Sequence, residues 1–327
     1  AKEIAANIPK NNWITTVEAK GGYVNFFIDT NCLTAATLQS ILEKKDTYGY
    51  LPKKGKKVII EHTSANPNGP LHVGRARNPI IGDTLVRIFK AAGYDVESQF
   101  YLDDMGKQVA ILAWGVNNID HRLIPASENK KADHQNVGFY QTANERMESD
   151  ETVAQQIGDI VKKLEQSDHK TIEMIHASYA PVLDGIKQSL LRINICIDTY
   201  IPESTFVHDK SVEKIIKELK QTPHCHEEDN AFYLDLEPFG IQGRNTKFFF
   251  LRKDGTTLYA PRDIAYHQWK SHHADMLMNV LGEDHKLESK QVRIALELLQ
   301  TKILPQVVFY AFVSLPGGKM STRRGRV

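Results

Sequence analysis

The sequence has few cysteines, no long apolar run and no secretory signal. Its three cysteines, Cys32, Cys196 and Cys225, lie far apart and form no CxxC pair, so neither a disulfide framework nor a four-cysteine zinc site is predicted. No apolar run reaches the roughly 18 residues of a membrane-spanning helix, and no signal peptide is visible. We therefore expect a cytoplasmic protein that has no membrane partner.

The sequence also has almost no excess of charge of either sign. It contains 41 Lys and Arg and 40 Asp and Glu, a formal net charge of +1. Proteins that bind nucleic acid often carry a clear basic surplus, so this balance argues mildly against strong RNA binding by the chain alone. Lysines cluster at residues 53–57, a pattern typical of a solvated linker. The tract His224-Cys225-His226 looks metal-binding, but its acidic neighbours at 227–229 favour a polar surface turn, and no metal site is predicted.

The residues that are present fit a large globular protein. Of the 327 residues, 41% are hydrophobic and 9% are aromatic, which allows a substantial core. This length indicates either more than one domain or one large α/β domain with insertions. No internal repeat or low-complexity segment is evident in the sequence.

Residues 57–93 have the pattern of a strand, a loop and a helix. The β-branched run Val58-Ile59-Ile60 is typical of a buried parallel strand. A loop rich in Ser, Asn, Pro and Gly follows at 63–70. Apolar residues then recur at helical spacing from Val73 to Ala92, before Gly93. This arrangement is the first half of a βαβ unit.

The start of the predicted helix carries His72, Gly74 and Arg75. A helix N-terminus offers unpaired N–H donors and the positive end of the helix dipole, which suits a phosphate group. Gly74 allows a nucleotide to approach the backbone closely. Taken alone, an HxGR tetrapeptide is more often a capping or core histidine beside a solvated arginine.

Strand and helix patterns continue downstream, with a polar helical stretch between them. A second strand, at 96–102, leads into a helix with acidic residues at its start. The polar stretch at 117–195 contains two long helix-period segments, at 139–166 and 171–192, and we expect a loop at 129–136. We interpret this stretch as an insertion into the α/β fold.

The last third of the chain returns to strand patterns. Its predicted elements are strands at 200–201, 232–236, 247–251, 257–259, 276–281 and 307–313, with helices at about 209–219, from Pro261, and up to about 299. This order favours an α/β fold with a doubly wound parallel, Rossmann-like sheet. Ligands then belong at the carboxyl ends of the strands, where His72, Glu203, Asp284 and Lys319 fall.

Two segments resemble the signature motifs of class I aminoacyl-tRNA synthetases. The segment EHTSANPNGPLHVGRARNPIIGD, at 61–83, resembles the HIGH region, and its flanks look like arginyl-tRNA synthetase of the archaeal type. Gly318-Lys319-Met320-Ser321-Thr322 resembles the KMSK motif. The two matches stand in the expected order, and each lies next to a predicted strand, so the resemblance is specific.

The resemblance implies a ligase that joins L-arginine to the α-phosphate of ATP, with Mg²⁺, and then transfers the arginine to tRNA(Arg). No covalent enzyme intermediate is involved, so catalysis rests on positioning and on donors that stabilise negative charge. The implied catalytic donors are His72, Arg75 and Lys319. The implied ATP-binding residues are His72, Gly74, Asn78, Asp284, His285, Lys319, Met320 and Ser321.

The implied amino-acid pocket must neutralise a guanidinium, which a planar carboxylate does through paired hydrogen bonds. Tyr259 and Asp263 are four residues apart, so they share a helical face. The segment 259–263 resembles the arginine-recognition motif of the family. Glu203 matches a second acidic position. Glu61 and Asn66 resemble the residues that hold the amino and carboxylate end of the substrate, and Ser64 is a further implied arginine-binding residue. Without the resemblance, such carboxylates are more often surface or capping residues.

The sequence departs from the family pattern at two positions. Thr322 stands in place of the last Lys of KMSK, and Gly69 stands where many arginyl enzymes that lack that Lys carry a compensating one. We expect Arg323 or Arg324 to supply the missing charge, although a solvated basic loop is an equal alternative.

The resemblance also divides the chain into four segments. They are a remnant of an N-terminal tRNA-contacting domain with a linker at 1–52, the two halves of the catalytic domain at 53–116 and 199–327, and a helical insertion at 117–198. The second half ends at the KMSK-like loop, without the anticodon-binding domain of the family. We therefore expect a monomer that binds its ligands and has weak activity, or none, by itself.

Two other functions are compatible with these residues. One is another nucleotidyltransferase of the HxGH type, which the long helical insertion and the Tyr259 and Asp263 pair disfavour. The other is a catalytically silent synthetase-like protein that binds ATP, arginine or a partner without turnover. ATP–pyrophosphate exchange with different acids separates the ligase from another nucleotidyltransferase, and arginine binding, compared with the binding of citrulline and lysine, tests for the guanidinium site.

Overall fold

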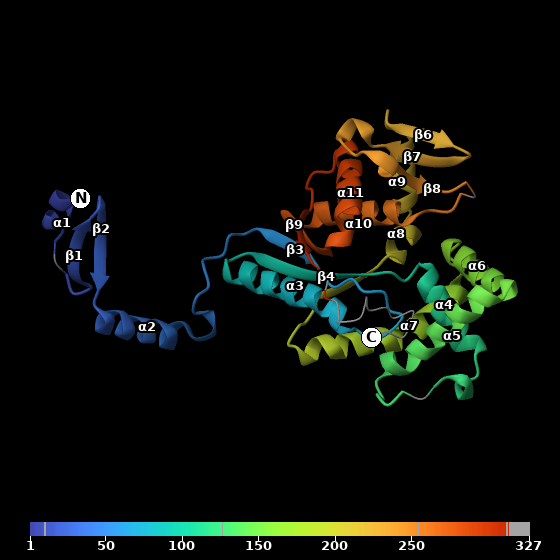
Figure 1. Cartoon of the computed structure of the whole chain (residues 1–327), viewed down its shortest axis with the longest axis horizontal. Coiled ribbons are helices and arrows are strands. Elements are labelled where there is room, and N and C mark those ends of the chain that lie inside the picture. The colour runs from blue at the N-terminus through green and yellow to red at the C-terminus, as the bar shows by residue number, and fades with distance from the viewer. Residues whose placement is uncertain (10, 126, 254, 312, 314–327) are drawn as a thin grey trace. The chain divides into compact units, whose positions relative to one another are not determined.

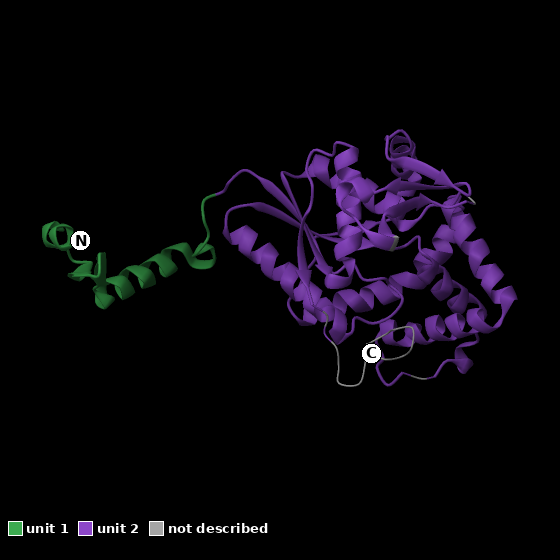
Figure 2. Cartoon of the chain, turned by 45° about the horizontal axis from the view of Figure 1, so that its top comes forward, with its two compact units in different colours: residues 1–52 green, residues 53–327 purple. Residues whose placement is uncertain are grey.

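The computed structural model describes residues 1–9, 11–125, 127–253, 255–311 and 313. The chain divides into two compact units, residues 1–52 and 53–327 (Figure 2). The small unit consists of α1 (Lys2–Asn7), the antiparallel pair β1 (Ile14–Lys20) and β2 (Tyr23–Ile28), and α2 (Thr30–Lys44). None of its described residues is buried, so these elements form no core of their own.

The large unit is built on a five-stranded sheet in the order β10-β9-β3-β4-β5, in which every neighbouring pair is parallel. Its strands are β3 (Lys57–Glu61), β4 (Asp95–Leu102), β5 (Thr199–Pro202), β9 (Met276–Gly282) and β10 (Gln306–Tyr310). The connection from β3 to β4 runs one way along the sheet, and that from β9 to β10 runs the other way. Right-handed crossovers therefore place their helices on opposite faces, and the predicted doubly wound sheet is confirmed.

Those crossover helices are α3 (Val73–Ala91), which packs on β3, β4 and β9, and α11 (Lys286–Leu298), which lies beside α10 (Tyr259–His273) across the sheet from α3 (Figure 1). The β-branched run at 58–60 is fully buried because helices cover both faces of the sheet. Val86 of α3 packs against that run and closes the core on its side.

The segment between β4 and β5 forms a helical layer. Its helices are α4 (Lys107–Asn118), α5 (Ala132–Ser149), α6 (Glu151–Glu165) and α7 (His169–Arg192). The predicted single helix at 139–166 is wrong, because Asp150 adopts an extended backbone there and its carboxylate caps α6 at Thr152 N. The predicted loop at 129–136 is also partly helical, since α5 begins at Ala132.

Glycine allows α4 and α5 to approach closely. A Cβ at Gly115 would lie 2.6 Å from the carbonyl oxygen of Phe139, a backbone atom that cannot easily move. Gly115→Ala should therefore lower the free energy of unfolding by about 2 kcal/mol, as overpacking does. Gly158→Ala, in α6, is the matched control because no atom lies within 4 Å of its Cβ position. It should stabilise the protein by up to about 1 kcal/mol. Urea unfolding measures both, and equal effects would contradict the close approach.

The region between β5 and β9 contains a second, antiparallel sheet. It consists of β6 (Cys225–Glu228), β7 (Ala231–Asp235) and β8 (Lys247–Leu251), beside α8 (Ser204–His208) and α9 (Ser211–Lys220). The predicted hairpin of 232–236 with 247–251 is confirmed. The predicted surface turn at 224–229 is wrong in part, because Cys225–Glu228 pairs with β7 as an edge strand.

The predicted strand at 257–259 is also wrong. Thr257 makes only an isolated bridge to Leu251, and Tyr259 is already the first residue of α10. Pro261 is therefore the third helical residue rather than the first, a place where its missing N–H still costs no helical hydrogen bond. Tyr259 and Asp263 accordingly lie one turn apart on the same helix.

Candidate active site

The carboxyl ends of the parallel strands bring distant loops to one edge of the sheet. Glu61 ends β3, Glu203 follows β5, and Gly282 ends β9. In doubly wound folds this edge is the place where ligands bind. The predicted site residues Glu61, His72, Glu203 and Asp284 all lie on segments that leave this edge.

His72 is the N-cap residue of α3, but its side chain makes no capping hydrogen bond. Its Nδ1 atom is buried and has no hydrogen-bond partner. Burial lowers the pKa of His72, and the nearby Arg75 cation lowers it further. Burial also lowers the pKa of Arg75. The capping interpretation of His72 is therefore excluded, and the two side chains stand together at a helix N-terminus that suits an anion.

The loop after β3 has a strained backbone. Thr63 and Ser64 have φ angles of 75° and 36°, and a positive φ is rare for a β-branched residue. Asn78 of α3 holds this turn, because its Oδ1 accepts from Thr63 N at 2.8 Å and its Nδ2 donates to Val280 O at 2.9 Å. Asn78 thus ties the loop to β9, and its predicted contact with ATP stays a prediction.

The same loop carries three residues of the predicted arginine site. Ser64 Oγ donates to Glu61 Oε1 at 3.2 Å, and it accepts from Tyr101 N at 3.1 Å. The other oxygen of Glu61 accepts from Lys270 Nζ at 2.7 Å. Asn66 is half-buried two residues further along the loop. Hydrogen bonds therefore hold both carboxylate oxygens of Glu61. The sequence assigned Glu61 to this site only through its resemblance to the family motif.

Glu203 forms a buried ion pair that the sequence analysis missed. Arg262 Nη1 donates to Glu203 Oε2 at 2.9 Å, and both side chains are almost fully buried. Burial raises the pKa of Glu203, Arg262 opposes this effect, and Asp103 adds to it. The neighbouring Asp104 carboxylate accepts from Ser204 N and Oγ at 2.8 and 2.6 Å, which fixes the loop after β5. The available signal in the sequence was Arg262 itself, which directly precedes Asp263 in the segment that resembles the arginine-recognition motif.

Asp263 lies one helical turn after Tyr259 and is in contact with His267. His267 Nδ1 lies 3.1 Å from the carboxylate oxygen Oδ1 of Asp263, and a third of the Asp263 side chain is exposed. Burial alone would raise the pKa of Asp263, but the neighbouring His267, which donates a hydrogen bond, and the Lys270 cation outweigh burial, and the pKa is lowered. The carboxylate is therefore ionised and reachable. Tyr259 is half exposed, and its ring centre lies 5.1 Å from the Arg262 guanidinium carbon.

The remaining predicted residues are placed as follows. Asp284 and His285 lie in the short 3₁₀ helix after β9, where the His285 ring is 3.0 Å from Glu288 and 3.7 Å from Asp284. The hydrogen bond to Glu288 raises the pKa of His285. Gly74 is buried in the first turn of α3. Lys319, Met320 and Ser321 lie outside the described residues, as do Thr322, Arg323 and Arg324.

The described ranges contain no group of three His, Cys, Asp or Glu side chains that could hold a metal ion. In the same ranges, no helix is both long enough and apolar enough to cross a membrane.

A doubly wound sheet with an anion-compatible helix N-terminus and carboxylates at its carboxyl edge is typical of nucleotide-binding α/β proteins. The sequence matches the family tRNA synthetases class I (R), catalytic domain, over residues 37–327, and the chain belongs to this family. The resemblance described above is therefore confirmed.

Similar proteins agree with this assignment. An arginine–tRNA ligase of Methanocella arvoryzae is 44% identical over 330 residues, which cover 100% of this chain and 58% of that protein. An arginine–tRNA ligase of Methanothermobacter thermautotrophicus is 43% identical, with coverage of 95% and 53%. The Thermus thermophilus arginyl-tRNA synthetase structure is 24% identical with a TM-score of 0.73, covers 95% of this chain and 56% of its own, and supports the fold. The chain spans somewhat more than half the length of these proteins.

Proposed function

We propose that this chain carries the catalytic part of an arginine–tRNA ligase. In the first step an oxygen of the L-arginine carboxylate attacks the α-phosphorus of ATP. The bond from that phosphorus to the bridging oxygen breaks, which gives arginyl-adenylate and pyrophosphate. In the second step the arginyl group passes to a ribose hydroxyl of tRNA(Arg), and AMP leaves. The observation that carries the proposal is that Glu61 and Glu203, at the ends of β3 and β5, each bond to a residue of α10, the helix that also carries Asp263.

Residues of α3 and of the KMSK-like segment bind the phosphate groups of ATP. His72 and Arg75 donate to phosphate oxygens, and the N–H groups of the first turn, with Gly74 among them, add the favourable end of the helix dipole. Lys319 pairs with the leaving pyrophosphate. Mg²⁺ enters as a complex with the ATP phosphates, since such ions are commonly held by substrate phosphates and few protein carboxylates.

Residues of α10 and of the loop after β3 bind L-arginine. Asp263 accepts two hydrogen bonds from the guanidinium, which Tyr259 flanks, while Glu61, Ser64 and Asn66 face the amino and carboxylate end. Asp263 suits this role because its pKa is lowered and a third of its side chain is exposed. We further propose that the protein acts in the cytoplasm as a monomer.

The test is calorimetric titration of L-arginine on the wild type and on Asp263→Asn. The variant keeps the size of the side chain but loses its charge, so the affinity should fall about 30-fold, the usual cost of a lost charged hydrogen bond. Asp159→Asn, an exposed position on α6, is the matched control and should bind arginine like the wild type. Citrulline and lysine should bind the wild type weakly. Equal binding of citrulline would contradict a guanidinium site and favour another nucleotidyltransferase.

A further inference from the structure

A chain of buried polar side chains connects Glu61 to Asp263 behind the proposed arginine pocket. Lys270 Nζ donates to Glu61 Oε2 at 2.7 Å and to Asn279 Oδ1 at 3.2 Å. Asn279 Nδ2 lies 2.7 Å from His267 Nε2. His267 Nδ1 lies 2.8 Å from the carbonyl oxygen of Asp263 and 3.1 Å from its carboxylate. Three elements, β3, α10 and β9, therefore meet through one continuous path.

The chemistry of the donors fixes the direction of every hydrogen bond in this path. An ammonium group can only donate, so the atom of Asn279 that faces Lys270 is its carbonyl oxygen. The amide nitrogen of Asn279 then faces His267 and must donate to Nε2. His267 is consequently neutral, with its proton on Nδ1, and donates that proton to Asp263. The lysine charge thus decides the tautomer of a histidine two hydrogen bonds away.

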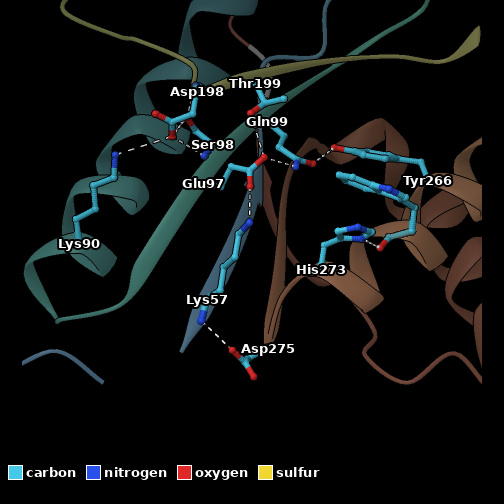
Figure 3. Close-up of polar contacts among 11 residues, drawn as sticks. Lys57, Lys90, Glu97, Ser98, Gln99, Asp198, Thr199, Tyr266, His273 and Asp275 are labelled. Carbon is cyan, nitrogen blue, oxygen red and sulfur yellow. Dashed lines mark hydrogen bonds and ion pairs between the residues drawn. The ribbon is translucent and has the colours of Figure 1, made fainter. Parts of the chain in front are cut away.

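The rest of the core holds this path rigidly. Lys270 is completely buried, and its Nζ lies 4.0 Å from the centre of the Tyr266 ring. The Tyr266 hydroxyl donates to Gln99 Oε1 at 2.8 Å, and Gln99 is in turn bonded to Glu97 (Figure 3). The Tyr266 ring also stacks on Tyr101, with the ring planes 3° apart. The Lys270 ammonium group therefore has no space to turn toward another hydrogen-bond partner.

We propose that His267, Asn279 and Lys270 are positioning residues that hold Asp263 and Glu61 as two fixed anchors for the opposite ends of L-arginine. This inference rests on the proposed function. The Nδ1–H group of His267 is shared between the carbonyl oxygen and one carboxylate oxygen of Asp263, and it thereby restricts the plane of the carboxylate, which a bidentate guanidinium contact requires. Lys270 pairs with Glu61 in this buried place and holds one of its carboxylate oxygens. The path thereby sets the spacing between the two anchors.

The decisive variant is Asn279→Asp, which keeps the size of the side chain and changes one donor into an acceptor. One carboxylate oxygen still accepts from Lys270, but the other now faces His267 Nε2 and draws a proton onto it. His267 becomes an imidazolium ion that pairs with Asp263 and competes with the substrate guanidinium. The affinity for L-arginine should fall about tenfold. Asn230→Asp, an exposed position in the β6–β7 turn, adds the same charge elsewhere and should not change the affinity.

Two measurements on the whole chain decide the proposal: calorimetric titration of L-arginine, and ¹⁵N NMR of the histidine rings. The His267 resonance is assigned by its loss in His267→Gln. At neutral pH the wild type should show the Nδ1–H tautomer, and Asn279→Asp should show both ring nitrogens protonated. An Nε2–H tautomer in the wild type overturns the proposal, and this measurement holds even if the variant does not fold.

The outcomes also separate this proposal from the function on which it rests. If the wild type binds arginine and Asn279→Asp binds it within twofold of the wild type, the positioning role is wrong and the ligase function stands. If the wild type shows the Nδ1–H tautomer but does not bind arginine, the proposed function fails, and the positioning role fails with it.

Discussion

Replacing Arg262 with methionine should lower the free energy of unfolding by about 3 kcal/mol, as expected when one partner of a buried ion pair is removed. Arg262 is 5% exposed and Glu203 is 2% exposed, and their closest atoms are 2.9 Å apart. Without Arg262, the Glu203 carboxylate faces Asp103 and Asp104 in a buried site. It must then take up a proton or remain as an unpaired charge. Urea unfolding at neutral pH, followed by circular dichroism, measures the loss.

Two further variants make this expectation specific. Lys247→Met removes one partner of an exposed ion pair with Glu228 on the antiparallel sheet, and it should cost much less because solvent screens both charges. Glu203→Gln in the Arg262→Met background should recover more than half of the loss, since no buried carboxylate is then left unpaired. A loss below about 1 kcal/mol for Arg262→Met alone would mean that the pair does not hold the loop after β5 in place.

The protein should lose stability on mild acidification because of His62. This side chain is 1% exposed, and burial lowers its pKa from 6.5 to about 4, against the opposing charges of Asp83, Glu61 and Asp198. Above pH 7 His62 is neutral in both the folded and the unfolded state, and it contributes nothing to the pH dependence of stability. Below about pH 6.5 His62 takes up a proton in the unfolded chain, whereas in the folded protein it becomes protonated only near pH 4. Stability should therefore fall across this window by up to about 3 kcal/mol.

The matched variant for this effect is His62→Asn, which keeps a polar atom near the Thr63 hydroxyl that His62 Nδ1 contacts at 2.8 Å. Its unfolding free energy should follow that of the wild type above pH 7 and decline less steeply from about pH 6.5 to about pH 4. The readout is the difference between the two proteins in urea unfolding across that range. Parallel curves throughout would show that His62 is protonated as easily in the folded state as in the unfolded chain.

Some features of the fold followed directly from the sequence. The β-branched run at 58–60, the loop after it and the amphipathic segment from Val73 predicted β3, the loop that follows β3, and α3, because each pattern depends on neighbours along the chain. The alternation of strands and helices predicted the doubly wound sheet, since parallel strands need crossover helices. The motif at 61–83 placed His72 and Asn66 on one loop.

Boundaries and edge strands were harder to predict. The break between α5 and α6 depends on Asp150, which leaves helical geometry although the apolar periodicity continues through it. Cys225–Glu228 reads as a polar turn because its strand character arises only from pairing with β7. Tyr259 was read as a strand residue because short apolar runs suit either structure, and the packing of α10 on the sheet decided for the helix.

The sequence by itself determined the family, the α/β architecture and which residues stand at the sheet edge, because motifs and periodicity are local properties. Only the tertiary structure decided how those residues are supported. Lys270 and Glu61 are 209 residues apart in the chain, and Arg262 and Glu203 are 59 apart, yet each pair shares a buried hydrogen bond. Such partners meet because α10 packs against β9 and beside the end of β3. A charge buried by that packing must find its counter-charge within the same few ångströms.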